Sequence, residues 1–160
     1  MTSTWIRLLM KKLPLLFLLF SVLAVEGQEI GLQLYSVRHQ SDEDLEGTLQ
    51  RVGEMGIHYV EGGGFGTYGL KNDAFNKLLA VNKLNMVSVG ASFDELRDSL
   101  DKIVSRAASV DARHVVWFWV PHQDTIFRIK ETQLAIHVFN EAGRKLMQSR
   151  ITLCYHPHGY

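Results

Sequence analysis

The sequence carries two histidines directly after its last apolar run. His156 and His158 follow residues 151–155, whose apolar and β-branched side chains predict a strand. Pro157 stands between them and lacks the backbone N–H that a strand ladder needs. Two imidazoles fall short of the three or four protein ligands that zinc sites commonly use. We therefore expect His156 and His158 to contact a substrate, and a structural role is the alternative.

A single carboxylate stands out in the first half of the chain. Glu61 ends a short strand-like run, 58–61, and three glycines follow it. Glycines allow backbone to approach a ligand closely, and a buried glutamate is rare without a partner. Substrate binding and a hydrogen-bonded structural role are both consistent with Glu61. The glycine run lacks the G-x-G-x-x-G spacing of a dinucleotide site, and no Ser-His-Asp order or phosphate loop is present.

Other candidates follow from position. Parallel α/β proteins bind ligands beyond the carboxyl ends of their strands, which selects Gln33 and Tyr35 on the first run and Ser88 on the third. On the fourth run, Trp117 and Trp119 are expected to share one strand face, and one of them could form an apolar wall for a sugar ring, although core packing is the favoured role for both together. The predicted substrate-binding set is Gln33, Tyr35, Glu61, Trp119, His156 and His158. We expect structural or solvated roles for the other histidines, His39, His58, His114, His122 and His137.

The elements that must position these residues repeat along the chain. Strand-like runs begin near residues 30, 58, 86 and 114, at a constant spacing of 28 residues, and a fifth begins at 151. Helical apolar spacing separates them, and strands alternating with helices indicate βαβ units in a parallel sheet. The predicted strands are 30–37, 58–61, 86–90, 114–120 and 151–155. Residues 28–160 amount to about half of a closed barrel of roughly 250 residues, so we predict an incomplete (β/α)8 TIM barrel of four βα units and a fifth strand.

Helix limits follow from capping residues and apolar spacing. We expect helices over 42–55 with first-turn acids, from about residue 72, after a cap at Asp94, and within 124–149. Gly56 should end the first helix as a C-cap. The predicted inner faces include Leu45, Leu49, Val52 and Met55, then Phe75, Leu78, Leu79 and Val81, then Leu96, Leu100, Ile103, Val104 and Ala107, and finally Leu134, Val138, Ala142 and Leu146.

Residues 1–27 have the layout of a secretory signal peptide. Basic residues at 7, 11 and 12 precede an almost wholly apolar run, 13–24, and small residues suitable for cleavage follow. The run is shorter than the roughly 20 residues that a membrane span needs. We expect cleavage that leaves a mature N-terminus between Val25 and Gln28, export to the periplasm or beyond the cell, and no stable membrane anchor. An uncleaved anchor is the alternative.

Charge and cysteine content restrict the partners. The whole chain has 17 basic and 17 acidic residues, and cleavage would leave 14 basic and 17 acidic. A weakly acidic domain without a basic stripe is not expected to bind nucleic acid. The single cysteine, Cys154, excludes an internal disulfide, and its apolar surroundings in the sequence predict a small buried side chain.

Several motifs occur in order along the chain: IGLQLYSVR at 30–38, GTL at 47–49, MG at 55–56, YVE at 59–61, YGL at 68–70 and YHPH at 155–158. They resemble the sugar phosphate isomerase/epimerase family, a xylose-isomerase-like TIM-barrel group, in an exported form. The resemblance covers about residues 28–160. It implies a divalent metal held at the ends of strands 5 to 8 of the complete barrel. It also implies two carboxylates that move a proton beside a carbonyl through an enediolate.

The resemblance also limits what can be transferred. The family pattern after strand 5 is H-x-H-x-x-E-F, and this sequence stops at Tyr160, before the glutamate. We therefore expect residues 28–160 to be the N-terminal part of such a barrel, with no catalytic residue or metal ligand, no bound metal, and little activity alone. Glu61, His156 and His158 match motif positions with substrate-contacting roles.

The expected ligand is a sugar or keto-sugar. Two alternatives are a keto-sugar lyase or dehydratase on the same barrel, and a non-catalytic carbohydrate-binding or interaction fragment. Since a partial barrel has open sheet edges, we also expect self-association.

Overall fold

The computed structural model describes residues 28–62, 68, 70–122 and 126–158. Its five strands are all parallel and lie in sequence order: β1 (Gly31–Gln33), β2 (Tyr59–Glu61), β3 (Asn85–Ala91), β4 (His114–Trp117) and β5 (Thr152–Tyr155). The helical segments are η1 (Leu34–Val37), α2 (Arg38–Glu43), α3 (Leu45–Glu54), α4 (Asn72–Val81), α5 (Phe93–Asp98), α6 (Leu100–Ser109) and α7 (Ile129–Gln148). The predicted parallel α/β architecture is therefore confirmed.

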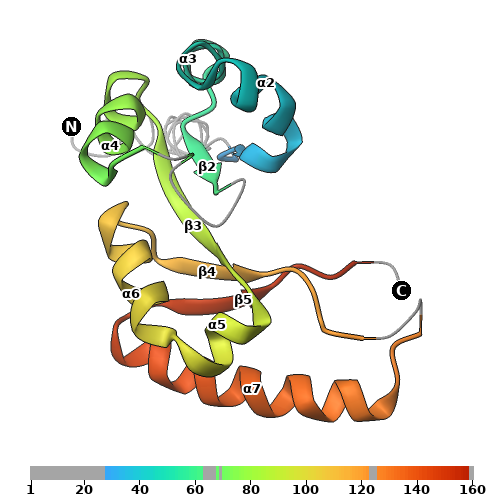
Figure 1. Cartoon of the computed structure of the whole chain (residues 1–160). Coiled ribbons are helices and arrows are strands. Elements are labelled where there is room, and N and C mark those ends of the chain that lie inside the picture. The colour runs from blue at the N-terminus through green and yellow to red at the C-terminus, as the bar shows by residue number, and fades with distance from the viewer. Residues whose placement is uncertain (1–27, 63–67, 69, 123–125, 159–160) are drawn as a thin grey trace, which may run out of the picture.

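The helices cover one face of the sheet. In Figure 1, α5, α6 and α7 lie together on the same side of β4 and β5. Val115 and Trp117 on β4 are almost completely buried in the core beneath these helices. The Trp117 ring packs against Phe93 of α5 and Phe139 of α7, with ring centroids 5.7 and 3.7 Å apart. We call the opposite side of the sheet, toward which Val116 points by strand alternation, the inner face.

The first strand is shorter than predicted. Instead of a strand over 30–37, pairing ends at Gln33 and the 3-10 turn η1 begins at Leu34. Leu34 is fully buried. A short apolar run looks the same whether it is a strand or a buried turn, because both remove every side chain from water. The apolar pattern of the sequence therefore continues past Gln33, although the backbone changes there from a strand to a 3-10 turn.

Two predicted helices are each divided in two. The first, predicted over 42–55, covers only the end of α2, which begins at Arg38, and then α3, where Asp44 is the cap and accepts a hydrogen bond from the Gly47 N–H at 2.9 Å. The second contains α5 and α6, which separate at Ser99. Gly56 ends the first helical region in a left-handed conformation, φ +78°, as predicted.

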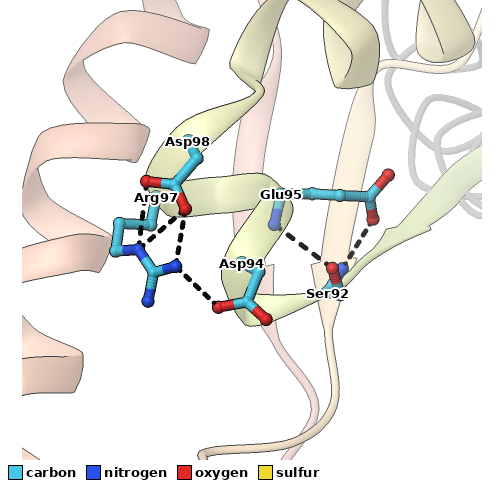
Figure 2. A network of polar contacts seen from close by, with 5 residues as sticks. All are labelled: Ser92, Asp94, Glu95, Arg97 and Asp98. Atoms are coloured by element: carbon cyan, nitrogen blue, oxygen red, sulfur yellow. Dashed lines mark hydrogen bonds and ion pairs between the residues drawn. The ribbon is translucent and has the colours of Figure 1, made fainter.

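The cap of α5 is Ser92 rather than Asp94. Figure 2 shows Ser92 and Glu95 exchanging hydrogen bonds, from the Glu95 N–H to Ser92 Oγ at 3.2 Å and from the Ser92 N–H to Glu95 Oε2 at 2.9 Å. This reciprocal arrangement satisfies two amide groups that the helix leaves unpaired. Asp94 instead lies in the first turn, where it forms a surface ion pair with Arg97 at 2.9 Å.

Some predicted core positions are exposed. Met55, Val81 and Leu134 are 74, 67 and 47% exposed. Met55 and Val81 lie at the ends of α3 and α4, where helical spacing continues past the last turn that reaches the sheet. Strand β4 ends at Trp117 rather than at residue 120, and Cys154 is half-buried rather than buried.

The predicted signal peptide, residues 1–27, lies outside the described residues, as does most of the glycine-rich loop at 62–69. Among the helices that the structure describes, none combines the length and apolar character required to cross a bilayer.

Candidate functional site

The first polar group of the site forms across three neighbouring strands. Gln33 of β1 is the register partner of Glu61 of β2, which is in turn the partner of Ser88 of β3. Paired residues on neighbouring strands point to the same face of a sheet. Gln33 Nε2 donates a hydrogen bond to Glu61 Oε1 at 2.5 Å. We call Gln33, Glu61 and Ser88 the polar row.

An irregularity in the pairing of β2 with β3 brings Ser88 into this row. Val60 pairs with Met86, whereas Glu61 pairs with Ser88, so the register shifts by one residue between these two pairs. Val60 and Met86 are both buried in the helix-covered core. The extra residue on β3 therefore turns Ser88 to the inner face beside Glu61, as β-bulges commonly re-aim side chains. Sequence position made Ser88 a candidate, but nothing in the sequence marked this bulge.

Cys154 of β5 lies on the same face as the polar row. It is the register partner of Val116, which points to the inner face. The pKa of the Cys154 thiol is raised, first because the group is partly buried and second because of the negative charge of Glu61. The carboxylate from β2 is therefore close enough to the thiol from β5 to act on its ionisation, although two strands separate them in the sheet.

A second group gathers aromatic and imidazole rings beyond β4 and β5. We call Phe118, Trp119, His122, His156 and His158 the aromatic–imidazole cluster. The centroid of Trp119 is 4.6 Å from that of His122 and 6.1 Å from that of His158. The centroid of His156 is 5.7 Å from that of Phe118 and 5.1 Å from that of His158. Backbone pairing between β4 and β5 continues as far as this cluster, since the His156 N–H donates to the Trp117 carbonyl at 2.9 Å.

His122 was predicted to be structural or solvated, and the structure instead places it in this cluster. Its Nδ1 lies 2.6 Å from the Val120 carbonyl oxygen, an atom that can only accept a hydrogen bond, and this contact suits the tautomer with a proton on Nδ1. The signal available in the sequence was its position just after the carboxyl end of the fourth apolar run.

The two tryptophans of that run have different surroundings. Trp117 is 1% exposed and belongs to the core, whereas Trp119 is 55% exposed. Because β4 ends at Trp117, the two side chains do not share a strand face. Of the two tryptophans, Trp119 is thus the more exposed, and its role in binding stays a prediction.

Tyr35 lies apart from the contacts that link the other predicted residues. It belongs to η1, is 54% exposed, and the Arg38 guanidinium lies 4.5 Å from the centroid of its ring. Arg38 Nη1 also donates to the Tyr35 carbonyl at 3.0 Å. The contacts of Tyr35 are therefore with its own helical turn.

The chemistry of these groups favours a neutral polar ligand. The polar row offers a carboxylate, an amide and a hydroxyl, and the cluster offers an exposed indole with imidazoles around it. Within the described ranges, no three His, Cys, Asp or Glu side chains converge as metal ligands would. These residues alone therefore do not fit the divalent metal site that the resemblance implies.

Comparison with known proteins gives structural matches only. No protein-family model and no curated protein matches the chain. A sugar phosphate isomerase/epimerase from Parabacteroides distasonis matches at TM-score 0.69 and 21% identity, covering 84% of this chain and 53% of the other. A xylose isomerase domain containing protein from Salmonella typhimurium matches at TM-score 0.63 and 16% identity, covering 84% and 51%.

A third solved structure comes from a different reaction type. The probable 3-DHS dehydratase AsbF from Bacillus anthracis matches at TM-score 0.58 and 16% identity, covering 79% of this chain and 51% of the other. The chain thus spans about half the length of each of these three solved structures. In fold, it is an incomplete TIM barrel that resembles half of a sugar phosphate isomerase/epimerase or xylose-isomerase-like barrel.

Proposed function

We propose that this half-barrel binds a sugar or keto-sugar at the carboxyl ends of its strands, as part of a barrel that isomerises or epimerises that compound. The observation that carries the proposal is the Gln33–Glu61 hydrogen bond at the carboxyl ends of β1 and β2. The aromatic–imidazole cluster follows the carboxyl ends of β4 and β5 in the same parallel sheet. Carboxylates and amides recognise hydroxyl groups, and an exposed indole offers an apolar face to a sugar ring. The solved structures of similar fold support the substrate class.

In the complete barrel, the reaction would transfer a proton on the carbon beside a carbonyl, through an enediolate. A divalent cation would stabilise the negative charge that develops on the oxygen. Its ligands would have to come from residues beyond the described set, so the proposal assigns the described residues to substrate binding and none of them to proton transfer. On this account the chain alone has little isomerase activity.

The dehydratase among the similar structures supports a second reading. An enediolate can also lose water, so a lyase or dehydratase acting on a related keto-sugar would use the same binding groups. A non-catalytic carbohydrate-binding fragment is the third reading. Isomerase and dehydratase assays on a reconstituted barrel separate the first two, whereas sugar binding with neither activity favours the third.

We also propose that the protein is exported, on the basis of the sequence pattern at 1–27. N-terminal sequencing of protein recovered outside the cytoplasm should find a start between Val25 and Gln28. Retention of Met1 on that protein would contradict this proposal.

Ligand-observed NMR with D-fructose and D-xylulose tests the binding proposal. The chain should show saturation transfer to either sugar, and His158→Ala should bind about tenfold more weakly if the lost contact is worth about 1.4 kcal/mol. His137→Ala, which replaces an exposed histidine on α7, is the matched control and should bind as the unchanged chain does. Absence of binding to both sugars would contradict the proposal.

A further inference from the structure

The hydroxyl of Ser88 lies in an unusual environment. Ser88 is 2% exposed, and its Oγ has no hydrogen-bond partner among the described residues. Buried polar atoms in native proteins nearly always have a partner, in the protein, in water or in a ligand. A partner for this hydroxyl would therefore have to come from outside the described residues, and a bound ligand could supply it.

Ser88 differs from the other buried groups that lack a partner in the described ranges. Trp117 Nε1 also has none, but Trp117 belongs to the helix-covered core. Ser88 is the register partner of Glu61 on the inner face, which is where a ligand would bind. The unmatched hydroxyl and the carboxylate therefore lie side by side on adjacent strands.

The hydrogen bonds already made define what could bind there. Glu61 Oε1 accepts from Gln33 Nε2, and the second carboxylate oxygen, Oε2, is an acceptor with the capacity for a further hydrogen bond. Ser88 can both donate and accept. Adjacent strands lie about 4.8 Å apart, a distance that two neighbouring hydroxyl groups of one ligand can bridge. The negative charge of Glu61 would repel a phosphate group, so this part of the site suits the uncharged part of a sugar.

We propose that Glu61 and Ser88 together bind two adjacent hydroxyl groups of the ligand, which makes Ser88 a specificity-determining residue of the site. This inference rests on the proposed sugar-binding function and names the part of the sugar that the inner face recognises. Glu61 accepts a hydrogen bond from one hydroxyl, and Ser88 donates to or accepts from its neighbour. Gln33 holds the carboxylate in the orientation that makes this possible.

The test compares binding and thermal stability in Ser88→Ala. If the hydroxyl serves a ligand, its removal should raise the melting temperature of the free chain, because an unpaired buried group is lost. The same change should weaken D-fructose binding about tenfold and reduce the preference for D-fructose over its 3-deoxy or 4-deoxy analogue. Ser41→Ala, at another buried serine, should leave sugar binding unchanged.

The possible results separate this inference from the proposed function. If the unchanged chain binds D-fructose and Ser88→Ala binds it equally well, the inference is wrong and the proposed function stands. A lower melting temperature in Ser88→Ala with unaltered deoxy-sugar discrimination would identify a structural serine and also overturn the inference. If the unchanged chain binds neither D-fructose nor its deoxy analogues, both the inference and the proposed function fail.

Glu61→Gln should weaken D-fructose binding as Ser88→Ala does, because the carboxylate is the stronger acceptor.

Discussion

Gln33 and Glu61 are joined across β1 and β2 by a hydrogen bond of 2.5 Å between side chains that are 28 residues apart in sequence. The spacing equals the repeat of the first strands, so each repeat contributes one member of the pair at the same level of the sheet. The bond to Gln33 restrains the Glu61 carboxylate in the absence of a ligand. Such restraint reduces the conformational entropy that the Glu61 side chain would otherwise lose when a ligand binds.

Replacement of Gln33 tests that restraint. Gln33→Ala should lower the free energy of unfolding by about 1 kcal/mol, since a partly buried side-chain hydrogen bond to a carboxylate is lost. Chemical denaturation measures the change, with the exposed Gln40→Ala on α2 as the matched control. Equal stability of the two variants would mean that the Gln33–Glu61 bond does not persist in solution.

The ion pair between Arg106 and Glu95 should support the fold more than its surface neighbours do. Arg106 Nη1 donates to Glu95 Oε1 at 2.8 Å, and Arg106 Nη2 donates to the Gly90 carbonyl at 2.9 Å. Arg106→Met should cost about 1.5–3 kcal/mol at neutral pH, the range for hydrogen bonds to charged groups. Arg97→Met, whose partners Asp94 and Asp98 are exposed, should cost less than about 1 kcal/mol. A comparable loss in both variants would contradict this ranking.

The same pair predicts how stability depends on pH. Burial disfavours the charged form of Glu95, but hydrogen bonds from Arg106 and Ser92 outweigh it and hold the pKa of Glu95 below its ordinary value of 4.5. A carboxyl with a lowered folded pKa contributes stability above its unfolded pKa and loses it as pH falls through the folded value. The free energy of unfolding, measured from denaturation curves, should therefore fall as the pH drops below about 4.5. It should fall less in Glu95→Gln. An identical slope in Glu95→Gln would show that other groups control acid unfolding.

We propose that the chain self-associates through the open edge of β5. The Thr152 and His156 N–H groups bond to β4, so the backbone groups of Leu153, between them, face away from β4. A groove of about 720 Å³ runs beside this edge, lined by Phe139, Asn140, Gly143, Arg144 and Met147 of α7 and by residues 151–155. Unpaired strand edges beside apolar surface invite pairing with another chain.

Paired methionine variants test this interface. Met147 lies in the groove and is 68% exposed, whereas Met55 is 74% exposed and lies at the end of α3. Light scattering should give a mass above that of one chain, and Met147→Lys should lower it while Met55→Lys should not. A monodisperse monomer for the unchanged chain would contradict the proposal.

The repeat made much of the fold predictable. A constant 28-residue spacing of the first four apolar runs, with a fifth run beginning at 151, was enough to predict five parallel strands with helices between them. It could not predict the end of β1 at Gln33, because Leu34 is buried in either conformation. Nor could it separate α5 from α6, where helical apolar spacing continues across Ser99 although the backbone does not.

The site was predictable in part, for a similar reason. Position at the strand ends selected Glu61, His156 and His158, and the structure places these at the inner face or in the aromatic–imidazole cluster. The bulge that turns Ser88 toward Glu61 depends on strand register, which no local sequence feature determined. His122 joins Trp119 because of the path of the chain after β4, which periodicity does not describe.

The most direct test of the polar site is the pH dependence of Cys154 alkylation by iodoacetamide. The chain has a single cysteine, and the Glu61 charge contributes to the raised pKa of its thiol. Glu61→Gln should lower that pKa, so that more thiolate is present at a given alkaline pH and the thiol reacts faster, while Glu43→Gln on α2 should match the unchanged chain. Identical pH profiles for all three proteins would show that the Glu61 charge does not act on the Cys154 thiol, and would contradict the account of the site.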